Sequence, residues 1–289
     1  VEYEDGTKST GNQFVWVPVG KIYTTADAAT KESTAVTINL SRYEFADGTS
    51  SYTANDGSDL GKLEKGTPID RGSSAIINSF NSSYTHTEDT TGKGNTPAIS
   101  ITEFKNKTNV AGGYYIARYE ASYGADGKAN SKISTGTPIK TNGTKPTAEG
   151  QLWNNITQPN AATASREMYK GETEFTSDLV NSYAWDTAIV FIQTFGGAEY
   201  EAYSRQDGKS INNQLTNTGV NGDNPLNIND MASNTLEWTT ETSSYPSGPC
   251  TLRGGDYDYS GDFTAVRGSY STSYSYYSYT FRPLLHVQN

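Results

Sequence analysis

Residues 256–279 constrain the fold more than any other part of the chain, because this stretch is almost entirely Tyr, Ser, Asp, Gly and Thr. An apolar core cannot be built from it, since each phenol and hydroxyl group would need a buried hydrogen-bond partner. It also makes a poor disordered linker, because disordered segments contain few aromatic residues. Tyr provides a large amphipathic contact, while Ser and Gly provide adaptable hydrogen bonds. The composition is therefore typical of a binding surface.

Two short segments frame this stretch, which we call the tyrosine run. Arg253, Gly254 and Gly255 precede it, and an apolar segment at residues 281–285 follows it. The alternative interpretation is a Tyr/Ser-rich edge strand or a low-complexity tail, but a tail would not end in a strand-like apolar segment. We therefore predict a ligand-binding region at about residues 256–279. Its predicted contact residues are Asp256, Asp258, Tyr259, Asp262, Tyr270, Tyr274, Tyr276, Tyr277 and Tyr279.

The net charge of the chain argues against some classes of binding partner. The formal net charge is −10, so the basic footprint of a nucleic-acid-binding protein is absent from the sequence. So is the basic amphipathic helix of a membrane-surface binder, and no apolar run is long enough to span a bilayer. The predicted partner is a protein or other macromolecular ligand, with no nucleic acid and no direct membrane insertion. The acidic residues of the run favour a basic or hydrogen-bond-donating epitope.

Cysteine and histidine are too scarce for the common metal sites. Cys250 is the single cysteine, so the chain can form neither an internal disulfide nor a thiolate zinc cluster. His86 and His286 have no companion at metal-ligand spacing and are predicted to be packing or surface residues. This polar, tyrosine-rich make-up fits an extracellular protein, at a bacterial cell surface or in a phage virion.

Periodicity and capping signals predict a few regular elements. An early strand is expected at residues 13–19 and another at 114–120. Ser100 and Glu103 form a capping box that predicts a short helix ending near Gly112. A helix at 161–170 capped by Asn160 and a helix at 184–195 are also expected. The second carries one apolar face, made of Trp185, Ala188, Ile189, Ile192 and Phe195.

The rest of the first hundred residues is predicted to decorate one core. A turn at Asp47-Gly48 suggests a hairpin from residues 35–43 to 51–53. We interpret about residues 25–100 as a polar elaboration, and residues 1–289 as a single domain.

Several blocks in order resemble the formylglycine-generating-enzyme (sulfatase-modifying factor) family. They are residues 14–18, 114–120, 184–188 and 227–239, then Arg253-Gly254-Gly255 and Phe281-Arg282. The resemblance covers roughly residues 13–24 and 110–285. It implies an α+β fold, an elaborated C-type lectin fold of this subtype with few helices, short strands and much irregular loop. The block at Asn234 and Glu237-Trp238 is similar to the family's GN-hydrophobic-WEW signature, with Ser233 in place of Gly and Leu236 in place of the first Trp.

The family's chemistry is not expected to carry over to this chain. The oxidising members bind copper with a pair of cysteines near the C-terminus, whereas Pro283 follows Phe281-Arg282 at about the place of a catalytic cysteine. Iron-dependent relatives use three histidines. The resemblance therefore predicts a non-enzyme that requires no cofactor. Two alternatives remain open. One is an oxidase of this family or another enzyme, using Asp258, Asp262, Glu237 or tyrosines. The other is a structural surface or tail protein.

The same resemblance implies a structural calcium site. Family members often hold Ca²⁺ with oxygens of the signature block, and the matching side chains are Asn234 and Glu237. In the alternative, Asn234 caps a turn and Glu237 pairs with an arginine such as Arg253. One carboxylate alone does not decide between the two.

A second branch with this fold contains the variable proteins of diversity-generating retroelements. These elements mutate adenines, so an Asn codon can become Tyr, Ser, Asp, Thr or Gly, among others. The tyrosine run consists almost wholly of that set, and Arg267 stands in it as a kept framework position. The resemblance therefore implies a receptor-recognition protein that displays a diversified Tyr/Ser/Asp surface on a C-type lectin scaffold.

Overall fold

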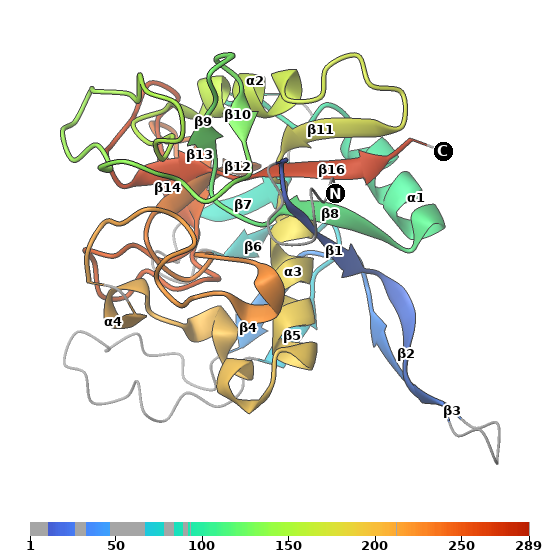
Figure 1. Cartoon of the computed structure of the whole chain (residues 1–289). Coiled ribbons are helices and arrows are strands. Elements are labelled where there is room, and N and C mark those ends of the chain that lie inside the picture. The colour runs from blue at the N-terminus through green and yellow to red at the C-terminus, as the bar shows by residue number, and fades with distance from the viewer. Residues whose placement is uncertain are drawn as a thin grey trace, which may run out of the picture.

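The computed structural model describes residues 11–26, 33–46, 67–77, 84–88, 92, 94–211 and 213–288. A four-stranded antiparallel sheet brings together segments from both halves of the chain (Figure 1). Its strands, in order, are β1 (Phe14–Pro18), β8 (Gly113–Ala117), β16 (Pro283–Val287) and β11 (Phe175–Leu179). The expected early strand is confirmed. Pro18 is tolerated because β1 lies at the edge of the sheet, where fewer backbone donors are needed.

The second large sheet is built mainly from the C-terminal third of the chain. Its main path is β14-β13-β12-β7-β6, and β15 pairs in parallel with β12. The strands are β6 (Ile76–Ile77), β7 (Thr85–Glu88), β12 (Leu236–Ser243), β13 (Cys250–Arg253), β14 (Gly268–Tyr270) and β15 (Tyr279–Phe281). This sheet contains Glu237 and Trp238 of the signature block, together with the part of the tyrosine run in β14 and its last residue in β15.

The three predicted helices are present, and the last two differ from the prediction at their ends. Helix α1 (Ile101–Ala111) begins after Ser100, whose hydroxyl accepts the Glu103 N–H at 3.1 Å, and ends at Gly112 with φ 77°. Helix α2 (Gln158–Glu167) begins three residues before the predicted start, and its N-cap is Thr157 and not Asn160. The reason is Pro159, whose fixed φ suits a first helical turn.

Helix α3 (Ser182–Phe195) is the centre of the main core. Trp185, Ala188, Ile189 and Ile192 of the predicted apolar face are all fully buried, while Phe195 is partly buried against Phe191. A second core cluster lies around β12, β13 and β15, with Trp238, Leu252 and Phe281 fully buried. The predicted α+β class, with few helices, short strands and much irregular loop, is confirmed.

Short elements complete the described chain. They are the hairpin β2 (Gly20–Ala26) with β3 (Ser33–Ile38), the pair β4 (Tyr43–Ala46) with β5 (Thr67–Asp70), the pair β9 (Ser122–Tyr123) with β10 (Ala129–Asn130), and the short helix α4 (Gly208–Ile211). Single 3₁₀ turns occur at Ala198–Tyr200, Tyr203–Arg205 and Pro225–Asn227. The β2–β3 hairpin projects from the body of the molecule, whereas β13 and β14 lie on the opposite side of the view (Figure 1).

The segment predicted to be a polar elaboration contributes to the interior. Arg42 and His86 are completely buried, and β7 pairs with β12 in the second sheet. The predicted Asp47-Gly48 turn lies outside the described residues.

Candidate ligand-binding surface

Strands of the second sheet position the tyrosine run before its start, within it and at its end. The run leaves β13, returns through β14, which pairs with β13, and ends in β15, which pairs with β12. The two glycines before it are required by close packing. Gly254 has φ 95°, and a Cβ at Gly255 would lie 2.0 Å from the carbonyl oxygen of Ala232. A larger residue at Gly255 would therefore displace the start of the run.

Arg267 fixes the middle of the run to the protein interior. Its guanidinium donates to the Asp186 carboxylate at 2.6 Å and to the Glu241 carboxylate at 2.8 Å. Arg253, in β13, pairs with both carboxylates, and Arg42, just before β4, pairs with Glu241. All five side chains are buried. The prediction that Arg267 is a framework position is confirmed.

A cavity of about 530 Å³ opens between the two halves of the run. Its walls come from the start of β12, the loop after β13, strand β14, the loop before β15 and the start of β15. The lining residues are Leu236, Asp256, Asp258, Tyr259, Asp262, Val266, Arg267, Gly268, Ser269, Tyr270, Tyr274, Tyr276 and Tyr279. Leu236, Val266, Gly268 and Ser269 were not predicted as site residues. An apolar residue such as Val266 inside so polar a run was the signal that could have identified this wall.

The tyrosines of the run form a connected aromatic cluster. Tyr270 and Tyr274 stack with ring centroids 5.3 Å apart at an interplanar angle of 17°, and Tyr276 and Tyr277 stack at 4.3 Å. Tyr279 lies beneath them, within 6 Å of the rings of Tyr270, Tyr274 and Tyr276. Offset-stacked and edge-to-face pairs are the favourable arrangements of aromatic rings, so these contacts stabilise the cluster.

The predicted contact residues divide into displayed and buried ones. Tyr259 and Tyr274 are 58% and 41% exposed, Asp258 is exposed, and the others except Asp256 and Tyr279 are partly buried. Asp256 and Tyr279 are buried residues of the cavity lining, so they are not the solvent-facing residues that the sequence suggested. Tyr279 belongs to β15 and packs on Trp238 at 5.7 Å, which explains its burial.

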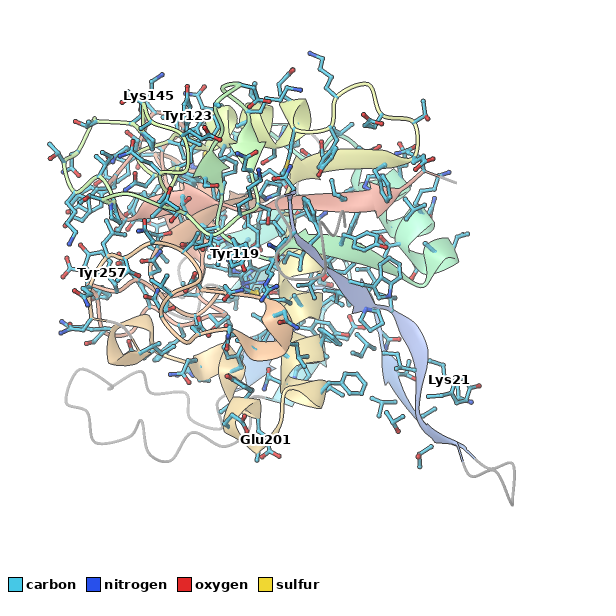
Figure 2. The ribbon with its side chains drawn as sticks, in the orientation of Figure 1. Lys21, Tyr119, Tyr123, Lys145, Glu201 and Tyr257 are labelled. Atoms are coloured by element: carbon cyan, nitrogen blue, oxygen red, sulfur yellow. The ribbon has the colours of Figure 1, made fainter. Side chains whose placement is uncertain are left out.

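Tyr257, the first tyrosine of the run, is partly buried. Figure 2 places it on the side of the molecule away from Lys21, which lies on the β2–β3 hairpin. The hairpin and the tyrosine run are therefore separate features of the surface.

The cavity is acidic. Burial raises the pKa of Asp262 to about 7, and the nearby carboxylates of Asp256 and Asp207 raise it further in the same direction. Burial also raises the pKa of Asp256 to about 6, although its carboxylate accepts the Asp258 N–H at 3.1 Å and the Ser278 hydroxyl at 2.9 Å. The positive charge of Arg267 is directed away, to Asp186 and Glu241.

The two predicted calcium ligands are used by other contacts. Both carboxylate oxygens of Glu237 accept hydrogen bonds from Arg282, at 2.5 and 3.0 Å. The Asn234 side chain accepts the Thr216 N–H at 2.9 Å and donates to Glu120 at 2.6 Å. Asn234 has φ 66°, a turn conformation. A guanidinium thus stands against Glu237 where a cation would bind, and these residues do not fit a calcium site. The arrangement is the alternative one, with Arg282 in place of Arg253.

Neither a metal cluster nor a reactive thiol appears in the described part of the chain. No group of three or more His, Cys, Asp and Glu side chains there could hold a metal ion. Cys250 is buried in β13, and burial raises the pKa of its thiol to about 12. Within the same residues, no helix is both long and apolar enough to cross a bilayer.

Comparison with solved structures gives distant likenesses. CarF matches with 13% identity over 61% of this chain and 87% of its own, at a TM-score of 0.44. Treponema denticola variable protein 1 matches with 15% identity over 60% and 84%, at 0.39. The Major Tropism Determinant M1 variant matches with 15% identity over 97% and 82%, at 0.40.

No model of a protein family matches the sequence, and no curated protein is significantly similar to it. Because all three TM-scores are below 0.5, the function of the chain has to be inferred from its own cavity and aromatic cluster.

Proposed function

We propose that this chain is a non-enzymatic binding protein that recognises a macromolecular ligand, such as another protein, through the tyrosine run. The observation that carries the proposal is the stacked, partly exposed tyrosine cluster around an acidic cavity, on a framework anchored by Arg267. Tyrosine is enriched among the residues that dominate binding energy at interfaces. Rings that are already stacked lose less freedom on binding than mobile side chains do.

The residues of the tyrosine run that face solvent differ from those that hold the run to the interior. This separation favours a surface whose sequence can be diversified. Tyr259 and Tyr274 are exposed and belong to neither core cluster. Arg267 and Tyr279, by contrast, are tied to the interior by ion pairs and ring packing. A scaffold of this kind tolerates many surface sequences, as a receptor-recognition protein outside a bacterial cell or on a phage particle would need.

The binding function is favoured over oxidation by the state of the single thiol. With its pKa raised to about 12, Cys250 stays protonated at neutral pH, and the thiolate is the form that binds metals and reacts.

The test is a binding screen against purified bacterial surface proteins and intact bacterial cells. A variant with Ser at Tyr259, Tyr274, Tyr276 and Tyr277 is compared with the native chain. Tyr23→Ser serves as the matched control, because Tyr23 is 61% exposed on the β2–β3 hairpin. We expect the native chain and the control to bind a common target, and the fourfold variant to bind it at least tenfold more weakly, equivalent to about 1.4 kcal/mol.

A target that the folded fourfold variant binds with native affinity would place recognition elsewhere. The same conclusion would follow if a different Tyr/Ser/Asp run, grafted between Gly255 and Thr280, left the affinity for that target unchanged.

A further inference from the structure

We propose that the cavity of the tyrosine run accepts a cationic side chain of the ligand, the guanidinium group of an arginine, between tyrosine rings and the carboxylates of Asp258 and Asp262. This inference rests on the proposed binding function and specifies the chemistry that the cavity selects. Three independent features of the cavity support it: its charge, its aromatic walls and its size.

Among the described residues, none forms an ion pair with the three aspartates that line the cavity. Asp256, Asp258 and Asp262 line it, and the cationic lining residue, Arg267, is committed to Asp186 and Glu241 at 2.6 and 2.8 Å. Asp256 is already bonded to Ser278 and to the Asp258 N–H. For Asp262, which is partly buried, the described residues provide no side-chain hydrogen bond and no ion pair. A partly buried carboxylate without such partners is stabilised in its charged form by a cation that a ligand brings.

The walls suit a flat, delocalised cation. Tyr274 lines the cavity and stacks with Tyr270 and, at 6.4 Å, with Tyr276, yet it is 41% exposed, so the exposed part of its ring can be reached by a ligand group. A guanidinium attracts the face of an aromatic ring and is more weakly hydrated than an ammonium group, so it loses less on entering an aromatic cavity. The molecule contains this contact elsewhere, since the Arg205 guanidinium lies 4.5 Å from the centroid of the Phe263 ring.

Size and ligand type argue against a bare metal ion. A volume of about 530 Å³ is far larger than a metal site and holds a side chain together with flanking backbone. Hard cations need several convergent oxygens, and the described residues contain no cluster of three potential ligands close enough together to hold a metal. An arginine within a peptide segment fits both the volume and the planar walls.

The test uses blocked tripeptides as probes, with the full chain titrated and followed by calorimetry. The two probes are Gly-Arg-Gly and Gly-citrulline-Gly, which differ in charge and hardly in shape. We expect the arginine probe to bind at least roughly tenfold more tightly, because only it can pair with the carboxylates. Asp262→Asn and Tyr274→Ser should each weaken it by about fivefold, in keeping with a partly desolvated ion pair and a cation–π contact.

Glu172→Gln is the matched control, because Glu172 is an exposed carboxylate in the loop before β11. It should bind the arginine probe like the native chain. Equal affinity for both probes, or no binding of the arginine probe up to its solubility limit, would overturn the inference. So would an unchanged affinity in a folded Asp262→Asn variant.

The two proposals can fail separately. If a macromolecular target depends on the displayed tyrosines while the arginine probe does not bind, the cavity chemistry is wrong and the binding function stands. If the arginine probe binds but the fourfold tyrosine variant keeps its macromolecular target, the cationic site stands and the tyrosine run is not the main recognition surface.

Discussion

At the scale of single residues, Arg267 decides whether the tyrosine run stays attached to the interior. Without its guanidinium, the buried negative charges of Asp186 and Glu241 have one positive partner fewer. We therefore expect Arg267→Gln to lower the free energy of unfolding by about 3–5 kcal/mol. Arg71→Gln breaks the exposed pair with Glu44 and should cost about 1 kcal/mol or less. Denaturant unfolding of both variants measures the difference. Equal, small losses would show that Arg267 is not an anchor.

The tyrosines of the run are expected to differ in the same measurement. Tyr259→Ser should change the free energy of unfolding by roughly 0.5 kcal/mol or less, since its side chain is mostly in solvent. Tyr279→Ser should cost about 3 kcal/mol or more, because it opens a cavity against Trp238. A large loss at Tyr259 would mean that the exposed part of the run is core.

At the scale of elements, α3 carries the main core and also supports the binding surface. The Trp185 indole N–H donates to the Thr264 carbonyl oxygen, inside the tyrosine run, at 2.9 Å. We expect Trp185→Ala to destabilise the fold by about 3–5 kcal/mol. Val110→Ala on α1 is the control, since Val110 is 81% exposed and should change stability by about 0.5 kcal/mol or less. Thermal melts that show similar losses for both variants would contradict the central place of α3.

At the scale of the whole molecule, the pKa values of the buried and partly buried carboxyl groups predict how stability depends on pH. Burial raises the pKa values of Glu88, Asp223 and Asp262 to about 7. Between about pH 4 and 7, the folded state therefore holds protons that the unfolded chain has lost. The contribution of these carboxyl groups to the free energy of unfolding declines as pH rises through that range. His86 acts oppositely, because burial lowers its pKa to about 3, but its contribution is complete above about pH 6.5.

We therefore expect the melting temperature to be higher at pH 6 than at pH 8. Asp223→Asn should reduce the difference, since it removes one of the raised carboxylates. Scanning calorimetry at the two pH values decides the matter, and a melting temperature that stays level or rises toward pH 8 would count against it.

Local signals in the sequence determined the elements that depend on near neighbours. The capping box at Ser100, the stop at Gly112 and the apolar face of α3 each involve residues within a few turns of one another, so the sequence specifies them. The start of α2 differs from the predicted one because the preference of Pro159 for a first helical turn outweighs the capping tendency of Asn160. The position of the candidate surface also follows from the sequence alone, through the composition of the tyrosine run and its two framing segments.

Only the tertiary structure decided which tyrosines are displayed and which charges are paired. Tyr259 and Tyr279 stand in the same polar run, yet one is exposed and the other buried, because β15 joins β12 through pairing over long sequence distance. Glu237 pairs with Arg282, 45 positions away, and not with Arg253. Periodicity reports on contacts along one element, whereas the partner of a buried charge is set by how distant strands pack. The acidic, aromatic cavity arises from that packing.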